Sequence, residues 1–297
     1  MGANLTLELR KQHPVHAAVH SRQLRQVQFS VHQADLTNLD ELDRLIAESS
    51  PDGVINCAGL TKIDQCVKEP ARAQRLNTWL PKKLAGITHK RDIRLVHVST
   101  ATVFDGRKGS YRETDSPNPL SHYARTKLEG ETAVLEQNPE AVIARVSMFG
   151  WSPSGKRSLA EFFYSHLRQG MRVPGFTDAV FSPLLVNHLA GIFQSLLTED
   201  IQGLFHVGGS DAVSKYEFGR MIARKFEFDP EDVVPARIKD HPFAGKRSPN
   251  VSMDNTKLME ALDREPIKLS TGLDQLYRLY QQGYPQELRN LAVNNLD

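Results

Sequence analysis

Tyr123 and Lys127 combine complementary proton chemistry with a spacing of four residues, in the segment SHYARTKLEGE. Four residues is close to one turn of an α-helix, so the phenol and the ammonium are predicted to share a helix face. A positive charge beside a phenol favours the phenolate and lowers the tyrosine pKa, which improves proton exchange near neutrality. The pair predicts proton transfer at a substrate oxygen, although the same spacing also occurs by chance on ordinary surface helices.

A buried strand begins at Leu95 and ends in two hydroxyl side chains, Ser99 and Thr100. Either hydroxyl could hydrogen-bond the oxygen to which the phenol gives its proton. The combination predicts chemistry at a carbonyl, with the hydride coming from another group.

The composition is that of an ordinary globular enzyme. The chain has 297 residues, enough for one large domain or two unequal ones, and a formal net charge of +2. This balance gives no reason to expect nucleic acid or a membrane surface as a partner. The two cysteines, Cys57 and Cys66, form neither a disulfide framework nor a metal-ligand spacing, so we expect a cytoplasmic protein without a metal.

Apolar strands alternate with amphipathic helices along the chain. The pattern predicts an α/β fold, a Rossmann-like doubly wound parallel sheet. Besides the strand ending at Thr100, the strands are expected at Val15–Ser21, Val27–Val31, Gly53–Asn56, Ala141–Ser147 and Gly203–Gly209. Helices are expected at Leu39–Glu48, Leu159–Gly170, Asn187–Leu197 and Ser214–Phe226, the last with Ser214 as its N-cap.

Further residues around the Tyr–Lys pair extend the pattern: Val-Phe-Asp-Gly ending at Gly106, a turn at Pro117–Pro119, and Leu-Glu-Gly ending at Gly130. In that order they resemble the extended short-chain dehydrogenase/reductases, in the branch of dTDP-4-dehydrorhamnose reductase. The resemblance implies an NAD(P)-binding domain from 1–150 plus about 183–202. It also implies a substrate-binding lobe from about 151–182 and 203–266, and a helical tail at 267–297.

The resemblance implies roles for the central residues. NADPH would deliver hydride to the C4 ketone of a nucleotide-linked 4-keto-6-deoxy sugar, a step of dTDP-rhamnose biosynthesis. Tyr123 would give the proton, and Lys127 would lower the tyrosine pKa and bind the nicotinamide ribose. Thr100, with Ser99 as the second choice, would hydrogen-bond the substrate oxygen.

Cofactor preference is indicated at the end of the Val15–Ser21 strand. An acid there would bind the ribose 2′-hydroxyl of NAD, whereas this chain has Ser21 and Arg22. A hydroxyl and a guanidinium suit a 2′-phosphate, so NADP(H) is preferred and NAD(H) remains an option. The alternative is a solvated polar turn.

Other cofactor contacts follow from the family pattern. Asp35 and Leu36 would border the adenine, and the small residues Asn56, Ala58 and Gly59 would let the cofactor approach the backbone. The resemblance also covers Asn77, which is otherwise a helix-surface amide.

The beginning of the chain departs from the pattern. Gly2 stands where the last glycine of a phosphate-binding turn would fall, with no apolar strand before it. We expect that the first strand and the glycine turn are missing, that two inner strands are unpaired, and that the chain binds dinucleotide poorly unless upstream residues are restored. The alternative is an ordinary helix with an accidental glycine.

The expected substrate contacts are weaker. Arg247, in the basic segment Lys-Arg-Ser-Pro, suits a diphosphate, or is part of a solvated loop. The family has Asp-Tyr where this chain has Ala101 and Thr102, and a Trp where it has Met148. Thr102 and Met148 would then contact the sugar, so a reductase mechanism is better supported than a named sugar.

Two other functions stay open. A nucleotide-sugar epimerase or dehydratase would use the same residues and recycle its cofactor. A non-catalytic regulatory or binding protein is the other alternative, because the resemblance includes a regulatory subunit of methionine adenosyltransferase. A homodimer is compatible with each of these functions.

Overall fold

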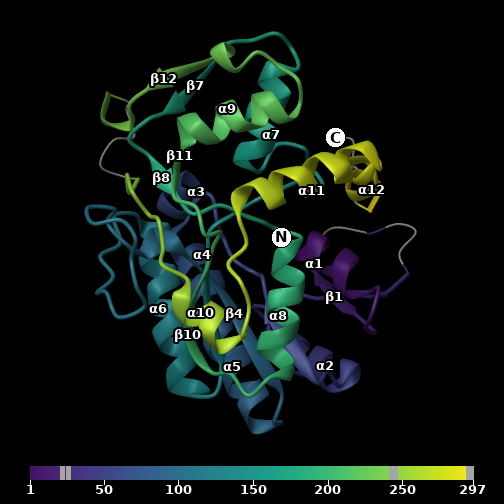
Figure 1. Ribbon diagram of the computed structural model, residues 1–297. Helices are drawn as coiled ribbons and strands as arrows, with labels where there is room; N and C mark the ends of the chain where they lie inside the picture. The colour runs from purple at the N-terminus through teal and green to yellow at the C-terminus, as the bar shows by residue number, and fades with distance from the viewer. Residues whose placement is uncertain (21–23, 25–27, 241–246, 292–297) are drawn as a thin grey trace.

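The computed structural model describes residues 1–20, 24, 28–240 and 247–291. Its centre is a parallel sheet in the order β10-β5-β4-β3 (Figure 1), made of β3 (Gly53–Asn56), β4 (Arg94–Thr100), β5 (Val142–Val146) and β10 (Gly203–Val207). β4 and β5 are rich in apolar and β-branched residues and are almost wholly buried, as expected of strands covered on both faces. The predicted α/β class with a parallel sheet is confirmed.

Helices cover both faces of this sheet. On one face, α2 (Leu39–Ser49), α5 (Leu80–Lys90) and α6 (His122–Gln137) pack around a core that includes Leu95 and Ile143. On the other face, α1 (Gly2–Leu9), α8 (His188–Thr198) and α10 (Thr256–Ala261) pack around a core that includes Val96 and Val142. Neighbouring residues of one strand thus face opposite layers, which follows from the alternation of side chains along a strand.

The sheet is divided in two. β1 (His16–Val19) and β2 (Ser30–Gln33) form a separate parallel pair, and among the described residues neither strand pairs with β3. The unpaired inner strands expected from the sequence are therefore observed. The strand expected at Val27–Val31 corresponds to β2, whose described pairing with β1 begins at Ser30.

A smaller lobe lies at the top of Figure 1, where α7 (Leu159–Leu167) and α9 (Lys215–Lys225) pack beside β7 (Val173–Phe176) and β12 (Val233–Ala236). The Ser214 hydroxyl accepts a hydrogen bond from the Glu217 N–H, as predicted for the N-cap of α9. One boundary needs correction. Residues 203–207 were assigned to the lobe, but as β10 they pair with β5 and extend the main sheet.

Short strands connect the lobe to the main sheet. β6 (Met148–Phe149) pairs with β9 (Leu184–Leu185), and β8 (Val180–Phe181) pairs with β11 (Val213–Ser214).

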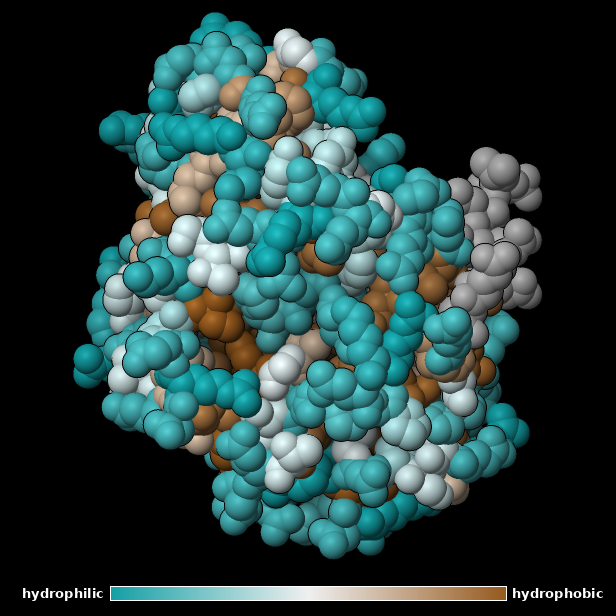
Figure 2. Space-filling model, turned by 45° about the vertical axis from the view of Figure 1, so that its right-hand side comes forward, coloured by the Kyte–Doolittle hydropathy of each residue, from teal (hydrophilic) through white to brown (hydrophobic). Residues whose placement is uncertain are grey.

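The C-terminal helices join the lobe to the first helix of the chain. α11 (Leu269–Gln281) and α12 (Tyr284–Leu291) bury leucines in the core of the lobe, and the Tyr284 hydroxyl bonds the Asn4 side chain on α1. In the face shown by Figure 2, hydrophilic residues cover most of the surface and hydrophobic ones form separate patches. None of the described helices is both long and apolar enough to span a membrane.

Candidate active site at the ends of β3 and β4

Tyr123 lies in the first turn of α6, whose start is fixed by the Ser121 side chain capping the Ala124 N–H at 3.1 Å. The phenol packs against the small apolar cluster of Leu60 and Cys66. Burial raises the pKa of Tyr123 to about 12, with a smaller opposing effect from the Thr100 hydroxyl. The predicted lowering of this pKa by the lysine is wrong for the structure described here, because desolvation dominates.

Lys127 follows one turn later on α6 and is only 4% exposed. Its Nζ donates a hydrogen bond of 2.7 Å to the Val98 carbonyl on β4 and lies 3.3 Å from His97 Nε2. Burial lowers the pKa of Lys127 to about 8. The described bonds of the amine therefore go to β4, and none of them goes to Tyr123.

The two hydroxyls at the end of β4 have different surroundings. Thr100 Oγ1 accepts a bond of 3.2 Å from the Thr102 N–H and lies 3.0 Å from Thr102 Oγ1, so these two threonines stand together beside Tyr123. The Ser99 hydroxyl instead donates to the Glu131 carboxylate. Glu131 also forms a buried ion pair with Arg145 at 2.7 Å. The expectation that Ser99 can serve the substrate is corrected, because its hydroxyl already has a buried partner.

Asn56, Ala58 and Gly59 form a tight turn after β3. Asn56 Oδ1 accepts a bond of 3.1 Å from the Ala58 N–H, and its Nδ2 lies 3.0 Å from His97 Nδ1. A Cβ on Gly59 would lie 2.9 Å from Asn77 Oδ1, which explains the glycine. The approach of a cofactor to this backbone stays a prediction.

Asn77 is fully buried and is not a surface amide. It lies in η1 (Arg75–Trp79), a π-helical turn between α4 (Pro70–Gln74) and α5. Its side chain accepts from the Leu60 N–H at 2.8 Å and donates to the Leu60 carbonyl at 3.0 Å. It also donates to Thr126 Oγ1 at 3.0 Å. Asn77 thereby ties the loop after β3 to α6, a role for which the sequence carries no signal beyond the family pattern.

The other predicted cofactor residues are only partly placed. Asp35 follows β2, and its carboxylate accepts hydrogen bonds from both the N–H and the hydroxyl of Thr37, which lower the pKa of Asp35. Leu36 packs against the core around α2 and α5. Gly2 faces the end of β3, since a Cβ on it would lie 3.9 Å from Cys57 Cβ. Ser21 and Arg22 lie outside the described residues.

A cavity of ≈ 530 Å³ adjoins this site. The cavity is lined by residues 61–65 and Lys68, which lie just before or within α3 (Ile63–Lys68), and by Arg247. Leu60 and Cys66, which pack against Tyr123, flank the same stretch. Arg247 therefore lines the same cavity as residues of the α3 segment that packs against the phenol, although Tyr123 itself is not a lining residue. Met148 on β6 is exposed and is not among the residues that line it either.

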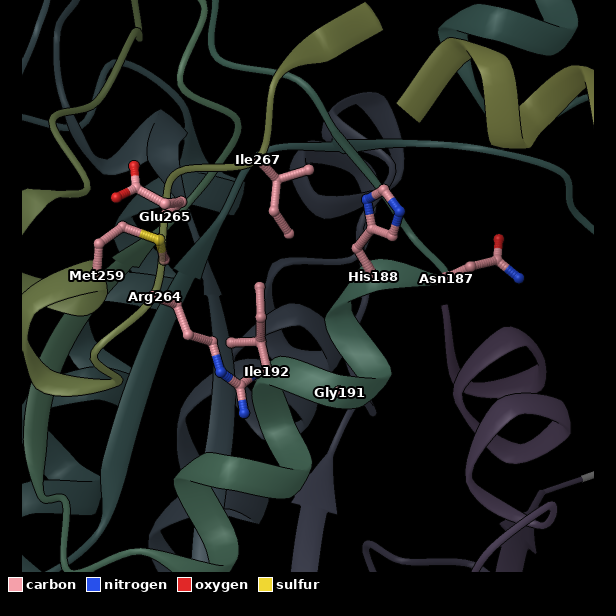
Figure 3. A pocket seen from close by; sticks show the side chains of 8 residues that line it. All are labelled: Asn187, His188, Gly191, Ile192, Met259, Arg264, Glu265 and Ile267. Carbon is pink, nitrogen blue, oxygen red and sulfur yellow. The ribbon is translucent and has the colours of Figure 1, made fainter. Parts of the chain in front are cut away.

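A second cavity, of ≈ 260 Å³, lies between α8 and the segment after α10 (Figure 3). Ile192, Met259 and Ile267 contribute apolar side chains, and Arg264 donates a bond of 2.6 Å to Ser195 Oγ. None of the predicted site residues is among the described residues that line it. We therefore locate the candidate site at the first cavity.

Comparisons with known proteins identify the family of this chain. A family model described as RmlD substrate binding domain matches residues 1–282. The probable low-salt glycan biosynthesis reductase Agl14 of Haloferax volcanii is 34% identical over 267 residues, covering 86% of this chain and 88% of that protein. The dTDP-4-dehydrorhamnose reductase of Mycobacterium tuberculosis is 33% identical over 222 residues, covering 73% and 72%.

Among solved structures, a hypothetical dTDP-4-dehydrorhamnose reductase from Sulfolobus tokodaii superposes with a TM-score of 0.79 at 29% identity. The match covers 92% of this chain and 94% of that one. The fold and the relatives thus agree, and this chain belongs to the RmlD substrate binding domain family.

Proposed function

We propose that this protein is an NADP(H)-dependent reductase of a nucleotide-linked 4-keto-6-deoxy sugar, with NAD(H) as an alternative cofactor. One observation carries the proposal: Tyr123, Thr100 and Lys127 gather at the carboxyl ends of β3 and β4, beside a cavity bordered by Arg247. Ligands of doubly wound sheets bind at the carboxyl ends of the strands. The names of the relatives, a glycan biosynthesis reductase and a dTDP-4-dehydrorhamnose reductase, support the same reaction.

The residues present fit the ribose and nicotinamide end of a dinucleotide. The Lys127 amine is buried at this end of the sheet, and Gly59 after β3 is exposed. Lys127 would bind the ribose hydroxyls, and Asn56 and Ala58 would line the approach to the ring. When bound, NADPH supplies the hydride.

Proton transfer is the task of this chain's own residues. With a pKa of about 12, the Tyr123 phenol is protonated at neutral pH and is in the form that can give a proton. It donates that proton to the oxygen of the ketone as negative charge develops there. The Thr100 hydroxyl hydrogen-bonds the same oxygen and helps to hold it in place.

The lining includes Arg247, Lys62 and Lys68 against the carboxylate of Asp64, so its net charge is positive, which suits the diphosphate of a nucleotide sugar. The polar Thr102 and the apolar Met148 are the proposed sugar contacts, in place of the larger side chains of the family. The division into a cofactor domain and a substrate lobe is also a proposal, as is a cytoplasmic location, which the free thiols of Cys57 and Cys66 support.

The test measures NADPH oxidation with a dTDP-linked 4-keto-6-deoxy sugar. Net consumption of NADPH is expected, whereas an epimerase or dehydratase would convert its substrate without net consumption. Tyr123→Phe is expected to lower kcat by about 10²-fold or more. Tyr280→Phe, a matched change at a partly exposed ring, should leave kcat unchanged. Near-full activity of Tyr123→Phe would disprove the assignment of the acid.

The divided sheet favours a second candidate, a binding or regulatory role without turnover. In this fold the phosphates of a dinucleotide are held near the strands at the centre of the sheet, and here the described residues of β1 and β3 belong to separate sheets. Failure to bind NADPH in a calorimetric titration, by a chain that is folded by circular dichroism, would favour this candidate over the reductase.

A further inference from the structure

His97 lies on β4, is fully buried, and contacts Lys127, one of the proposed site residues. Its ring lies between two side chains of the site. Nδ1 is 3.0 Å from Asn56 Nδ2, and Nε2 is 3.3 Å from Lys127 Nζ. Each ring nitrogen therefore has one polar neighbour. Because a neutral imidazole has one donor and one acceptor nitrogen, these two neighbours determine which nitrogen carries the proton.

The orientation of Asn56 decides which nitrogen carries that proton. Asn56 Oδ1 accepts from the Ala58 N–H, so the amide nitrogen is the atom that faces His97. An amide nitrogen only donates, so His97 Nδ1 must be the acceptor. A neutral imidazole has a single acceptor, so Nε2 carries the proton and points it at Lys127.

With His97 in this tautomer, Lys127 must be the neutral amine. An ammonium has three donors and no acceptor, so it cannot receive the Nε2–H. A neutral amine has a lone pair that accepts from Nε2–H while its own N–H donates to the Val98 carbonyl at 2.7 Å. If Lys127 is charged, His97 must carry its proton on Nδ1 instead, and the bond from Asn56 is lost.

We propose that His97 is a positioning residue for the reaction: it holds the Lys127 amine against β4 and, through Asn56, selects its proton state. Lys127 becomes a cation when the pH falls or when an acceptor for its protons enters the site. His97 then moves its proton from Nε2 to Nδ1 without gaining charge. This inference rests on the proposed function, since it concerns how the same site is prepared.

The surroundings agree with a ring that stays neutral. Burial, with a contribution from the nearby Lys127 charge, lowers the pKa of His97 well below its usual value. The described groups that act on the lysine charge are Glu131, one turn later on the same helix α6, and Cys57, which follows β3. Both favour the ammonium, but Glu131 is engaged by Arg145, and burial raises the pKa of the Cys57 thiol to about 11.

The test uses nitrogen-15 NMR of the histidine rings in the full chain without cofactor. At about pH 9.5, where Lys127 is neutral, His97 is expected as the Nε2–H tautomer. As the pH falls, the ring should switch to Nδ1–H, with the same midpoint as the titration of the Lys127 ε-carbon. An Nδ1–H tautomer at high pH, or a tautomer that does not change with pH, would overturn the proposal.

Two variants separate coupling from structure. Lys127→Met should abolish the switch and keep His97 as Nε2–H, while Lys90→Met, at the exposed end of α5, should change nothing. Asn56→Asp offers only acceptors, so it should fix Nδ1–H at every pH. Should these variants not fold, the titration of the unchanged chain decides by itself.

The tautomer measurement and the turnover assay can fail separately, so failure of this inference is distinguishable from failure of the proposed function. If the chain shows no NADPH-dependent turnover but the tautomer switch occurs, the proposed function fails and the coupling stands. If turnover occurs, the dependence of kcat/KM on pH can be measured for both proteins. The pKa assigned to Lys127 in that profile should be about one pH unit higher in Asn56→Asp, which is a tenfold higher proton affinity. A pKa that does not move in a folded, active variant would contradict the role of His97.

Discussion

Burial sets the proton chemistry of Tyr123 and Lys127 in opposite directions. The phenol is held as the neutral acid by a pKa of about 12, and the amine is pushed toward its neutral form by a pKa of about 8. Both shifts arise from desolvation, which disfavours whichever form is charged. The Lys127 amine therefore loses its charge at a lower pH than an exposed lysine would, and a ligand that brings hydrogen-bond acceptors would raise the pKa of Lys127 again.

The lysine shift predicts how stability depends on pH. Because the folded pKa lies below the unfolded one, the unfolded chain binds more protons between about pH 8 and 10.5, and stability contributed by this group rises across that window. Lys127→Met should therefore stabilise the chain more at pH 7 than at pH 9.5, by about 2 kcal/mol. Urea unfolding of both proteins at the two pH values measures the difference. An equal effect at both would contradict the shift.

Ser99 and Thr100 provide a second prediction at this scale. Thr100→Val keeps the shape of the side chain and removes its hydroxyl, so kcat should fall by about 10²-fold. The lost bond from the Thr102 N–H should lower the free energy of unfolding by about 0.5–2 kcal/mol. Ser99→Ala should leave kcat nearly unchanged and lower the free energy of unfolding by about 1–3 kcal/mol, because the bond to buried Glu131 is lost. Steady-state kinetics and urea titration of both variants decide, and the reverse pattern would restore Ser99 to the active site.

At the scale of elements, the site depends on how closely α6 crosses η1. Gly130 on α6 makes this approach feasible, since a Cβ there would lie 2.1 Å from the Asn77 carbonyl oxygen. That contact is with backbone and cannot be relieved by a side-chain rotation. The same crossing holds Asn77 against Thr126, so it positions the turn of α6 that carries Tyr123.

Gly130→Ala should therefore be strongly destabilising, by about 3 kcal/mol, and should lower activity because α6 must shift. Gly191→Ala on α8 is the matched control, because its added methyl would meet nothing within 4 Å. The control should be neutral or stabilising by about 0.5–1 kcal/mol. Thermal unfolding compares the two, and similar Tm values would show that the crossing is more adaptable than described.

The elements show where sequence reasoning succeeds. The shared face of Tyr123 and Lys127 follows from helical spacing, and the N-cap Ser214 follows from local chemistry. The bond of Ser99 to Glu131, the direction of the Tyr123 pKa and the pairing of 203–207 with β5 all depend on distant segments. The periodicity of the sequence does not show what a hydroxyl at a strand end contacts, how far a phenol is buried from water, or which strand pairs with which.

At the scale of the molecule, the cavity joins the main domain to Arg247 of the later chain. Arg247→Met should raise KM for the nucleotide sugar by about 10–100-fold with kcat little changed, since a charge-assisted bond to the diphosphate is worth about 1.5–3 kcal/mol. Arg237→Met removes an exposed guanidinium on the same lobe and should change neither constant. A fall in kcat with an unchanged KM would contradict binding of the diphosphate by Arg247 and would place this residue near the reacting ketone.

The divided sheet also bears on how the molecule opens. A two-stranded sheet on its own is marginally stable, and β1 and β2 are at most half buried, whereas β4 and β5 lie in a continuous core. The chain should therefore consist of two cooperative units of unequal stability. Amide hydrogens of residues 16–19 and 30–33 should exchange through local unfolding, orders of magnitude faster than those of β4 and β5. Limited proteolysis would begin in that unit and leave the strand of Thr100 and the helix of Tyr123 folded together.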